Sequence, residues 1–215
     1  MVTHLGHACL LVEIADARIL IDPGNFTPAL EQQTGLDVIL ITHRHPDHLD
    51  PQRVPQVVAA NPRAAVYSEP STVSALADAG VGGTALAEGE PLDLGGVTLT
   101  GIGHQHAEIY REIPRIGNMG MLLHASGEPS LLHPGDSYAS TPEGVDILAA
   151  PLTAPWAALK ETIDFVRAVK PGRVFPIHDA VVSQQGRGIY YRQLGTFLPG
   201  GASIQDLAGA GPTRF

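Results

Sequence analysis

Three histidines and an aspartate lie within six residues, directly after the short apolar run at 38–41. The four side chains are His43, His45, Asp47 and His48. Proline disfavours helical backbone in the residue before it, so residues 42–46 are predicted to form a turn after a strand. Side chains two apart in an extended segment point to the same side, so His43 and His45 can bind one cation, leaving Asp47 and His48 for a second. Imidazole nitrogen and carboxylate oxygen suit zinc, iron or manganese.

Further ligand-type side chains follow other predicted strands. His104 and His106 come after residues 97–102, Asp136 comes after residues 130–132, and His178 comes after residues 174–177. Strand ends gathered at one edge of layered sheets support a site rigidly. We therefore predict a first cation on His43, His45 and one of the pair 104/106, a second on Asp47, His48 and His178, and a bridging Asp136. The alternatives are a histidine-rich polar loop without metal, and an Asp136 that only caps its own turn.

Apolar periodicity and turn residues predict the elements that carry these side chains. Strands are expected at 10–14, 18–21, 38–41, 64–67, 97–102, 119–124, 130–132, 146–149 and 174–177, and helices at 52–60, 71–79, 155–170 and 190–198. Asp50 and Ser71 are the expected N-caps of the first two helices. The third helix has the clearest apolar stripe, with Trp156 as a core anchor. Alternating strands and helices predict an α/β layered domain, and residues 1–215 are expected to form one domain.

Composition and charge narrow the functional classes. The chain has 215 residues, 44% of them hydrophobic, and a formal net charge of -9. This charge disfavours nucleic acid and anionic membranes as partners, so a small-molecule substrate is expected, with an anion among the candidates. Cys9 is the single cysteine, which excludes an intrachain disulfide. We see neither a secretory signal nor an apolar run of the ~20 residues that span a bilayer, so a cytoplasmic protein is expected.

The motif Thr42-His-x-His-x-Asp-His-Leu-Asp50 resembles the signature of the metallo-β-lactamase superfamily. Asp136, in a His-Pro-Gly-Asp segment, and His178 follow in that family's usual order. The segments Gly6-His7-Ala8, His106-Ala107-x-Ile109 and Pro176-Ile177-His178 resemble the branch that includes ascorbate-6-phosphate lactonase. The resemblance implies a four-layer αβ/βα sandwich. It also favours His106 over His104 as a ligand, because a small residue follows the middle histidine in that branch, and it makes Asp22 similar to the family's early aspartate.

The predicted chemistry is hydrolysis at a dinuclear centre. Two divalent cations, with zinc preferred over manganese or iron, can share a water and lower its pKa, and the resulting hydroxide would attack a small ester, lactone or phosphodiester. Asp47 would bind metal and orient the hydroxide, and Asp22 would hold a ligand in position. His7 and His104 are expected at the pocket and, with Tyr110, are the candidates for protonating the leaving group. The alternatives are an iron-dependent oxygenase or redox protein on the same scaffold, and a non-catalytic metal-binding module.

Overall fold

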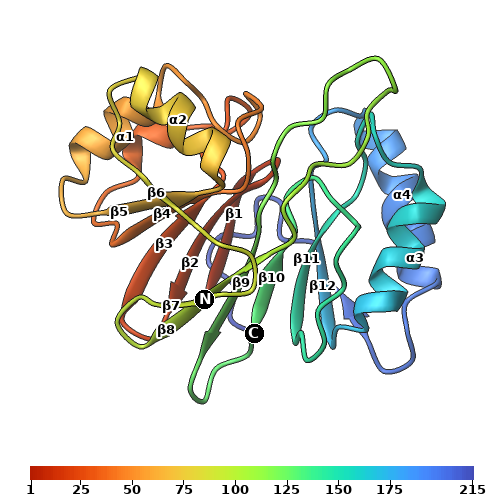
Figure 1. Cartoon of the computed structure of the whole chain (residues 1–215). Coiled ribbons are helices and arrows are strands. Elements are labelled where there is room, and N and C mark those ends of the chain that lie inside the picture. Colours follow the sequence, from red (N-terminus) through yellow and green to blue (C-terminus); the bar gives the residue numbers. More distant parts are fainter.

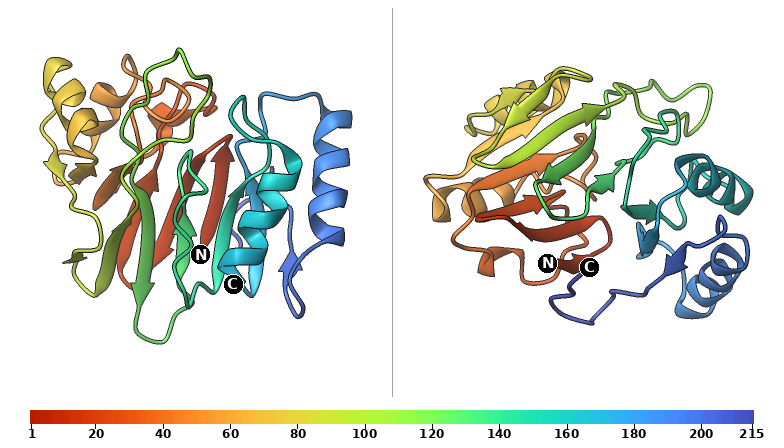
Figure 2. Two further views of the ribbon diagram at one scale, coloured as in Figure 1. Left: turned by 45° about the vertical axis from the view of Figure 1, so that its right-hand side comes forward. Right: turned by 90° about the horizontal axis from the view of Figure 1, so that it is seen from below.

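The computed structural model describes residues 1–215, which form two β-sheets that pack face to face with helices outside (Figures 1 and 2). The first sheet has the strand order β1-β2-β3-β4-β5-β6. Its strands are β1 (Val2–Gly6), β2 (Cys9–Ile14), β3 (Ala17–Ile21), β4 (Val38–Ile41), β5 (Ala65–Ser68) and β6 (Thr84–Ala85). The pairs β1–β2 and β2–β3 are antiparallel, and the pairs from β3 to β6 are parallel.

The second sheet has the order β13-β12-β11-β10-β9-β8-β7. Its strands are β7 (Pro91–Asp93), β8 (Val97–Ile102), β9 (Gly120–Ala125), β10 (Leu131–His133), β11 (Ile147–Pro151), β12 (Arg173–Ile177) and β13 (Ser203–Ile204). The pairs from β7 to β10 are antiparallel, and those from β10 to β13 are parallel. The layered α/β domain expected from the sequence pattern, and the αβ/βα sandwich implied by the family resemblance, are therefore confirmed.

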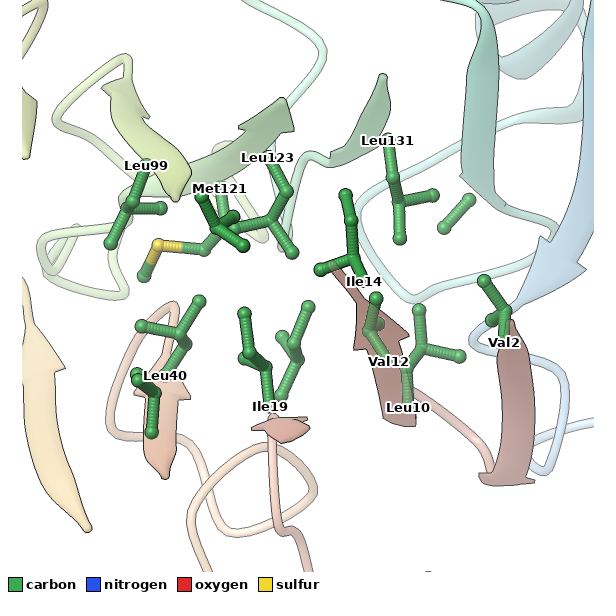
Figure 3. Close-up of a cluster of buried hydrophobic side chains, with 14 of the residues drawn as sticks. Val2, Leu10, Val12, Ile14, Ile19, Leu40, Leu99, Met121, Leu123 and Leu131 are labelled. Carbon is green, nitrogen blue, oxygen red and sulfur yellow. The ribbon is translucent and has the colours of Figure 1, made fainter. Parts of the chain in front are cut away.

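The main core lies between the two sheets (Figure 3). Leu10, Ile19 and Leu40 from the first sheet face Met121 and Leu123 from the second, and all five are fully buried. Every second residue of these strands points into this layer, as the two-residue period of a strand requires. Burying such side chains is the main source of stability for a sandwich of this kind.

Two further apolar layers attach the helices. Helices α1 (Val54–Ala60) and α2 (Pro70–Asp78) cover the outer face of the first sheet, and α3 (Leu159–Val169) and α4 (Gln184–Thr196) cover the second (Figure 1). A single 3-10 turn, η1 (Leu30–Gln32), lies between β3 and β4. No helix is both long and apolar enough to cross a bilayer.

The first two helices begin differently from the prediction. Asp50 accepts hydrogen bonds from the backbone N–H groups of Gln52 and Arg53 (2.9 and 3.0 Å), but this caps a turn, and α1 begins only at Val54. Glu69, not Ser71, caps α2, because its carboxylate accepts from the N–H groups of residues 71 and 72.

The last two helices also have shifted bounds. α3 begins at Leu159, three residues after Trp156, so the tryptophan lies in the preceding loop rather than in a helical stripe. α4 begins at Gln184, well before the predicted start at residue 190, with Ser183 as its N-cap. Gly186 and Gly188 lie in its first half, and their low helix propensity hides this part of the helix from sequence reasoning.

Candidate metal centre

Strand direction brings the ligand-type side chains together. β1, β3 and β4 run the same way, because β1 and β3 are both antiparallel to β2 and β4 is parallel to β3. In the second sheet β8, β10 and β12 also share one direction. The residues that follow the carboxyl ends of these strands are His7, Asp22, His43, His45, Asp47, His48, His106, Asp136 and His178. Both sheets therefore contribute side chains to the site at one edge of the sandwich.

The first group of potential ligands is His43, His45, His106 and Asp136. One ligand atom from each residue lies within 4.8 Å of the others. His43 Nε2 is 3.1 Å from His45 Nδ1, and His106 Nε2 is 3.3 Å from Asp136 Oδ2. His43 and His106 are buried, whereas His45 is partly exposed and leaves the group open on its side. The four side chains thus bring one ligand atom each close enough together to hold a single cation.

The second group is His7, Asp47, His48 and His178. Asp47 Oδ2 lies 3.1 Å from His7 Nε2, 3.4 Å from His178 Nε2 and 3.9 Å from His48 Nε2. The three imidazoles are buried, and the Asp47 side chain is 24% exposed. Asp47 is therefore the member of this group that faces the solvent opening.

Asp136 lies between the two groups. Its Oδ2 is 3.3 Å from both His106 Nε2 and His178 Nε2, and its Oδ1 is 3.1 Å from His48 Nε2. Burial would raise the pKa of Asp136, but the positive charge available on His48 and His178 holds that pKa well below its usual range. An ionised carboxylate in this place is a suitable bridge between two cations.

Hydrogen bonds at Nδ1 fix the orientation of three of these rings. His48 Nδ1 lies 2.7 Å from Asp22 Oδ2, His106 Nδ1 lies 2.6 Å from the carbonyl oxygen of Ala107, and His178 Nδ1 lies 2.8 Å from that of Thr153. Because each partner is an acceptor, Nδ1 donates the hydrogen bond, and Nε2 is the ring nitrogen that faces the site. This is the usual arrangement of a metal-binding histidine.

Buried polar atoms without hydrogen bonds test whether the site fits a metal. His48 Nε2, His106 Nε2, His178 Nε2 and Asp136 Oδ1 have no hydrogen-bond partner, although buried polar atoms are normally paired. Four of the six buried side-chain atoms without a partner thus belong to the two groups, and the other two, His4 Nδ1 and Arg18 Nε, lie outside them. Imidazole nitrogen and carboxylate oxygen are suitable ligands for zinc, iron or manganese. Because these atoms are buried, lack hydrogen bonds and lie close together, the residues present fit such ions.

His7 has the opposite orientation from these rings. Its Nδ1 accepts a hydrogen bond from the backbone N–H of Ala180 (3.3 Å), so in the neutral ring Nε2 carries the proton. That N–H points at Asp47 Oδ2, 3.1 Å away. His7 is held there by a left-handed backbone (φ 53) and by the N–H of His178, which donates to its carbonyl oxygen. Geometry therefore favours His7 as an N–H donor to Asp47 rather than as a metal ligand.

Asp22 supports the loop at residues 42–48, which carries His43, His45 and His48. Its Oδ1 accepts from the backbone N–H of Thr42 (2.7 Å), and its Oδ2 accepts from Thr42 Oγ1 (2.8 Å) and from His48 Nδ1. Asp22 is fully buried and has a left-handed backbone (φ 49). Its carboxylate thus contacts both Thr42 and the ring of His48.

Two candidates from the sequence lie outside the site, which corrects their expected places. The His104 side chain is 76% exposed and its Nδ1 lies 2.8 Å from Glu88 Oε2. Tyr110 is 49% exposed on the loop after β8. Both therefore lie on the surface, where neither contacts the two ligand groups.

Sequence reasoning missed the contact of Trp156 with the site. Its indole Nε1–H donates to Asp136 Oδ2 at 2.8 Å. The same side chain lines a cavity of about 480 Å³, together with Ala107, Arg115, Ser137, Tyr138 and Phe165. No sequence signal indicated this position, because the tryptophan fits the apolar stripe of the following helix and its partner lies 20 residues away.

The family model described as "Beta-lactamase superfamily domain" matches residues 1–178. Protein Rv0786c of Mycobacterium tuberculosis is 45% identical over 193 residues, covering 89% of this chain and 90% of the relative. A UPF0173 metal-dependent hydrolase of Xanthobacter autotrophicus is 34% identical over 149 residues, covering 63% of this chain and 61% of the relative.

Solved structures share the fold at low sequence identity. Igni18, a metallo hydrolase from the archaeon Ignicoccus hospitalis, has a TM-score of 0.73 and 17% identity, covering 95% of this chain and 93% of that one. CmlA, a diiron β-hydroxylase from Streptomyces venezuelae, has a TM-score of 0.69 and 17% identity, covering 95% of this chain but 52% of that one. These likenesses support the sandwich architecture. The resemblance to the ascorbate-6-phosphate lactonase branch stays a prediction.

Proposed function

Because the chain belongs to the metallo-β-lactamase superfamily, we propose that it is a metal-dependent hydrolase of a small ester, lactone or phosphodiester. The observation that carries this proposal is the set of four buried, unpaired donor atoms that converge at one edge of the sandwich. The name of the Xanthobacter relative, a metal-dependent hydrolase, supports the same reaction class.

In this proposal the chain holds two divalent cations. His43, His45 and His106 would hold one, Asp47, His48 and His178 the other, and Asp136 would contact both. When bound, such cations supply Lewis acidity and a nucleophilic water at neutral pH. Zinc is the first choice, and the same donors also suit manganese or iron.

The protein's own groups orient the reactants. Asp47, the carboxylate at the solvent opening, would bind metal and accept a hydrogen bond from the attacking water. His7 holds a proton on Nε2 beside that carboxylate. Of the three histidine and tyrosine candidates for protonating the leaving group, His7 alone lies in the site, whereas His104 and Tyr110 are on the surface.

The cavity beside Trp156 is the proposed place for the part of the substrate that does not react. Its volume of about 480 Å³ lies within the usual range of about 300–1,000 Å³ for small-ligand pockets. It adjoins the ligand groups through Ala107, next to His106, and through Ser137, next to Asp136. Ala107, Glu108 and Arg115 line one wall of it, and α3 and residues 137–141 line the other.

Metal analysis combined with an activity screen tests this function. The purified protein should contain two equivalents of metal per chain by mass spectrometry and should turn over at least one class in a panel of lactones, phosphodiesters and thioesters. Asp136→Ala should lose the second equivalent and turnover, because it removes the carboxylate shared by both groups. Asp78→Ala, on the exposed end of α2, is the matched control and should behave as the unmodified protein.

The same experiment separates the alternatives. Two irons with no hydrolysis of any ester would favour an oxygenase or redox role, which the same donors permit. Two zinc ions with no turnover of the whole panel would favour a non-catalytic metal-binding module. Full activity of the Asp136→Ala protein with one metal per chain would contradict the dinuclear mechanism.

A further inference from the structure

Trp156 is the only tryptophan of the chain, and its position beside Asp136 is not explained by packing alone. The residue is half-buried in the loop before α3. Its ring centroid is 6.1 Å from that of His106 and 6.3 Å from that of His178, with the rings nearly perpendicular in both pairs. Trp156 therefore touches one histidine from each ligand group as well as the carboxylate between them.

The indole N–H controls which lone pairs of Asp136 remain free. Oδ2 accepts from Trp156 Nε1 at 2.8 Å, whereas Oδ1 has no hydrogen bond. A hydrogen bond to a charged acceptor is among the stronger ones in proteins. It limits rotation of the carboxylate and so fixes the direction in which Oδ1 and the other lone pair of Oδ2 point.

Contacts with further aromatic residues hold the Trp156 side chain in place. Its ring lies edge-on to Tyr138 at 4.8 Å, and Tyr138 is stacked on Phe165 of α3 at 4.7 Å. The Tyr138 hydroxyl donates to the carbonyl oxygen of Pro151 (2.8 Å) and lies 2.9 Å from Thr162 Oγ1. A chain of aromatic contacts thus connects Asp136 to α3 and leaves Trp156 little freedom to move.

We propose that Trp156 is a positioning residue for the metal centre, which acts by orienting Asp136 through its indole N–H. The inference rests on the proposed metal site but not on any particular reaction. Partners that orient metal ligands typically contribute about 10-fold to 100-fold in metal affinity. We expect a loss in that range when the N–H is removed and the ring is kept.

A single-atom replacement tests this directly, because the chain has one tryptophan. Biosynthetic replacement of tryptophan by 3-benzothienylalanine substitutes sulfur for the indole N–H and preserves the shape of the ring. Zinc affinity is measured by competition with a chelating dye. The replaced protein should bind zinc about 10-fold to 100-fold more weakly, with unchanged far-ultraviolet circular dichroism.

Two variants accompany this experiment. Trp156→Phe, which also lacks the N–H donor, should weaken zinc binding by a similar factor. Tyr191→Phe, which alters an aromatic residue of α4 that lies in neither ligand group, should leave zinc affinity unchanged. Equal zinc affinity in the benzothienylalanine protein and the tryptophan protein would overturn the proposal, whatever Trp156→Phe does to folding.

A second readout uses the tryptophan itself. Indole fluorescence responds to the charge of a hydrogen-bonded partner, so zinc added to the metal-free protein should change the emission in proportion to the zinc bound. Unchanged emission while the dye competition registers zinc binding would contradict contact between Trp156 and the metal-binding carboxylate. Because neither readout measures turnover, a failure of the proposed hydrolysis remains distinguishable from a failure of this inference.

Discussion

At the scale of single residues, the hydrogen bond at one ring nitrogen determines what the other nitrogen can do. His48, His106 and His178 each have an acceptor at Nδ1, which frees Nε2 for a cation. His7 has a donor at Nδ1 and therefore presents a proton. The sequence predicts that these histidines approach one another. It does not predict which acceptor or donor lies beside each ring, because that partner reaches the ring only when the chain folds.

The pair His104 and His106 provides a prediction at this scale. His106→Gln should lower metal content towards one equivalent and abolish turnover, because it removes a buried nitrogen 3.3 Å from Asp136. His104→Gln is the matched control on the same loop and should keep both metals, because its side chain is 76% exposed. Metal analysis of the two purified variants makes the comparison. Loss of metal in the His104 variant alone would reverse the assignment.

At the scale of elements, the sequence predicts where ligands occur better than it predicts what supports them. His43, Asp136 and His178 each follow closely on an apolar strand, so a local pattern is enough to find them. Trp156 and Asp136 belong to different loops, and His7 meets Ala180 across 173 residues, so neither contact leaves a local pattern. The helix starts differ from the prediction for a related reason, since Glu69 and Ser183 are identified as caps only by the hydrogen bonds that they accept in the folded chain.

Gly24 shows how closely two loops pack at the site. A Cβ added there would lie 1.8 Å from the carbonyl oxygen of Asp47. Either the loop after β3 or the loop at residues 42–48 would therefore have to move. We predict that Gly24→Ala weakens metal binding in the second group by about 10-fold or more, which is the range for disturbed supporting contacts. Isothermal titration with zinc measures the effect.

Gly82→Ala is the control for this change. A Cβ at Gly82 meets nothing within 4 Å, and the residue has no left-handed backbone, so the added methyl group has room. Its zinc affinity should equal that of the unmodified protein. If Gly24→Ala also bound zinc normally, the close approach of the two loops would not be important for holding Asp47.

At the scale of the whole molecule, each proposed cation would connect the two sheets. His43 and His45 follow β4 of the first sheet, whereas His106 and Asp136 follow strands of the second. In the other group, Asp47 and His48 belong to the first sheet and His178 to the second. The family resemblance predicted this sandwich, while hydrophobic patterning by itself indicated only alternating layers. Patterning cannot specify how two sheets face each other, because the contacts of the central core join residues distant in the sequence.

Removal of metal should therefore lower the stability of the whole fold. A ligand that binds only the native state at 100 times its Kd stabilises it by about 2.7 kcal/mol. For a chain of this size, that amounts to roughly 5–11 °C in Tm. We predict a decrease of this order when the protein is dialysed against EDTA, and recovery on addition of zinc, measured by differential scanning calorimetry. Asp136→Ala should show a much smaller difference between the two conditions, since it has lost the carboxylate between the groups. An equally large shift in that variant would mean that the stabilising metal binds elsewhere on the acidic surface.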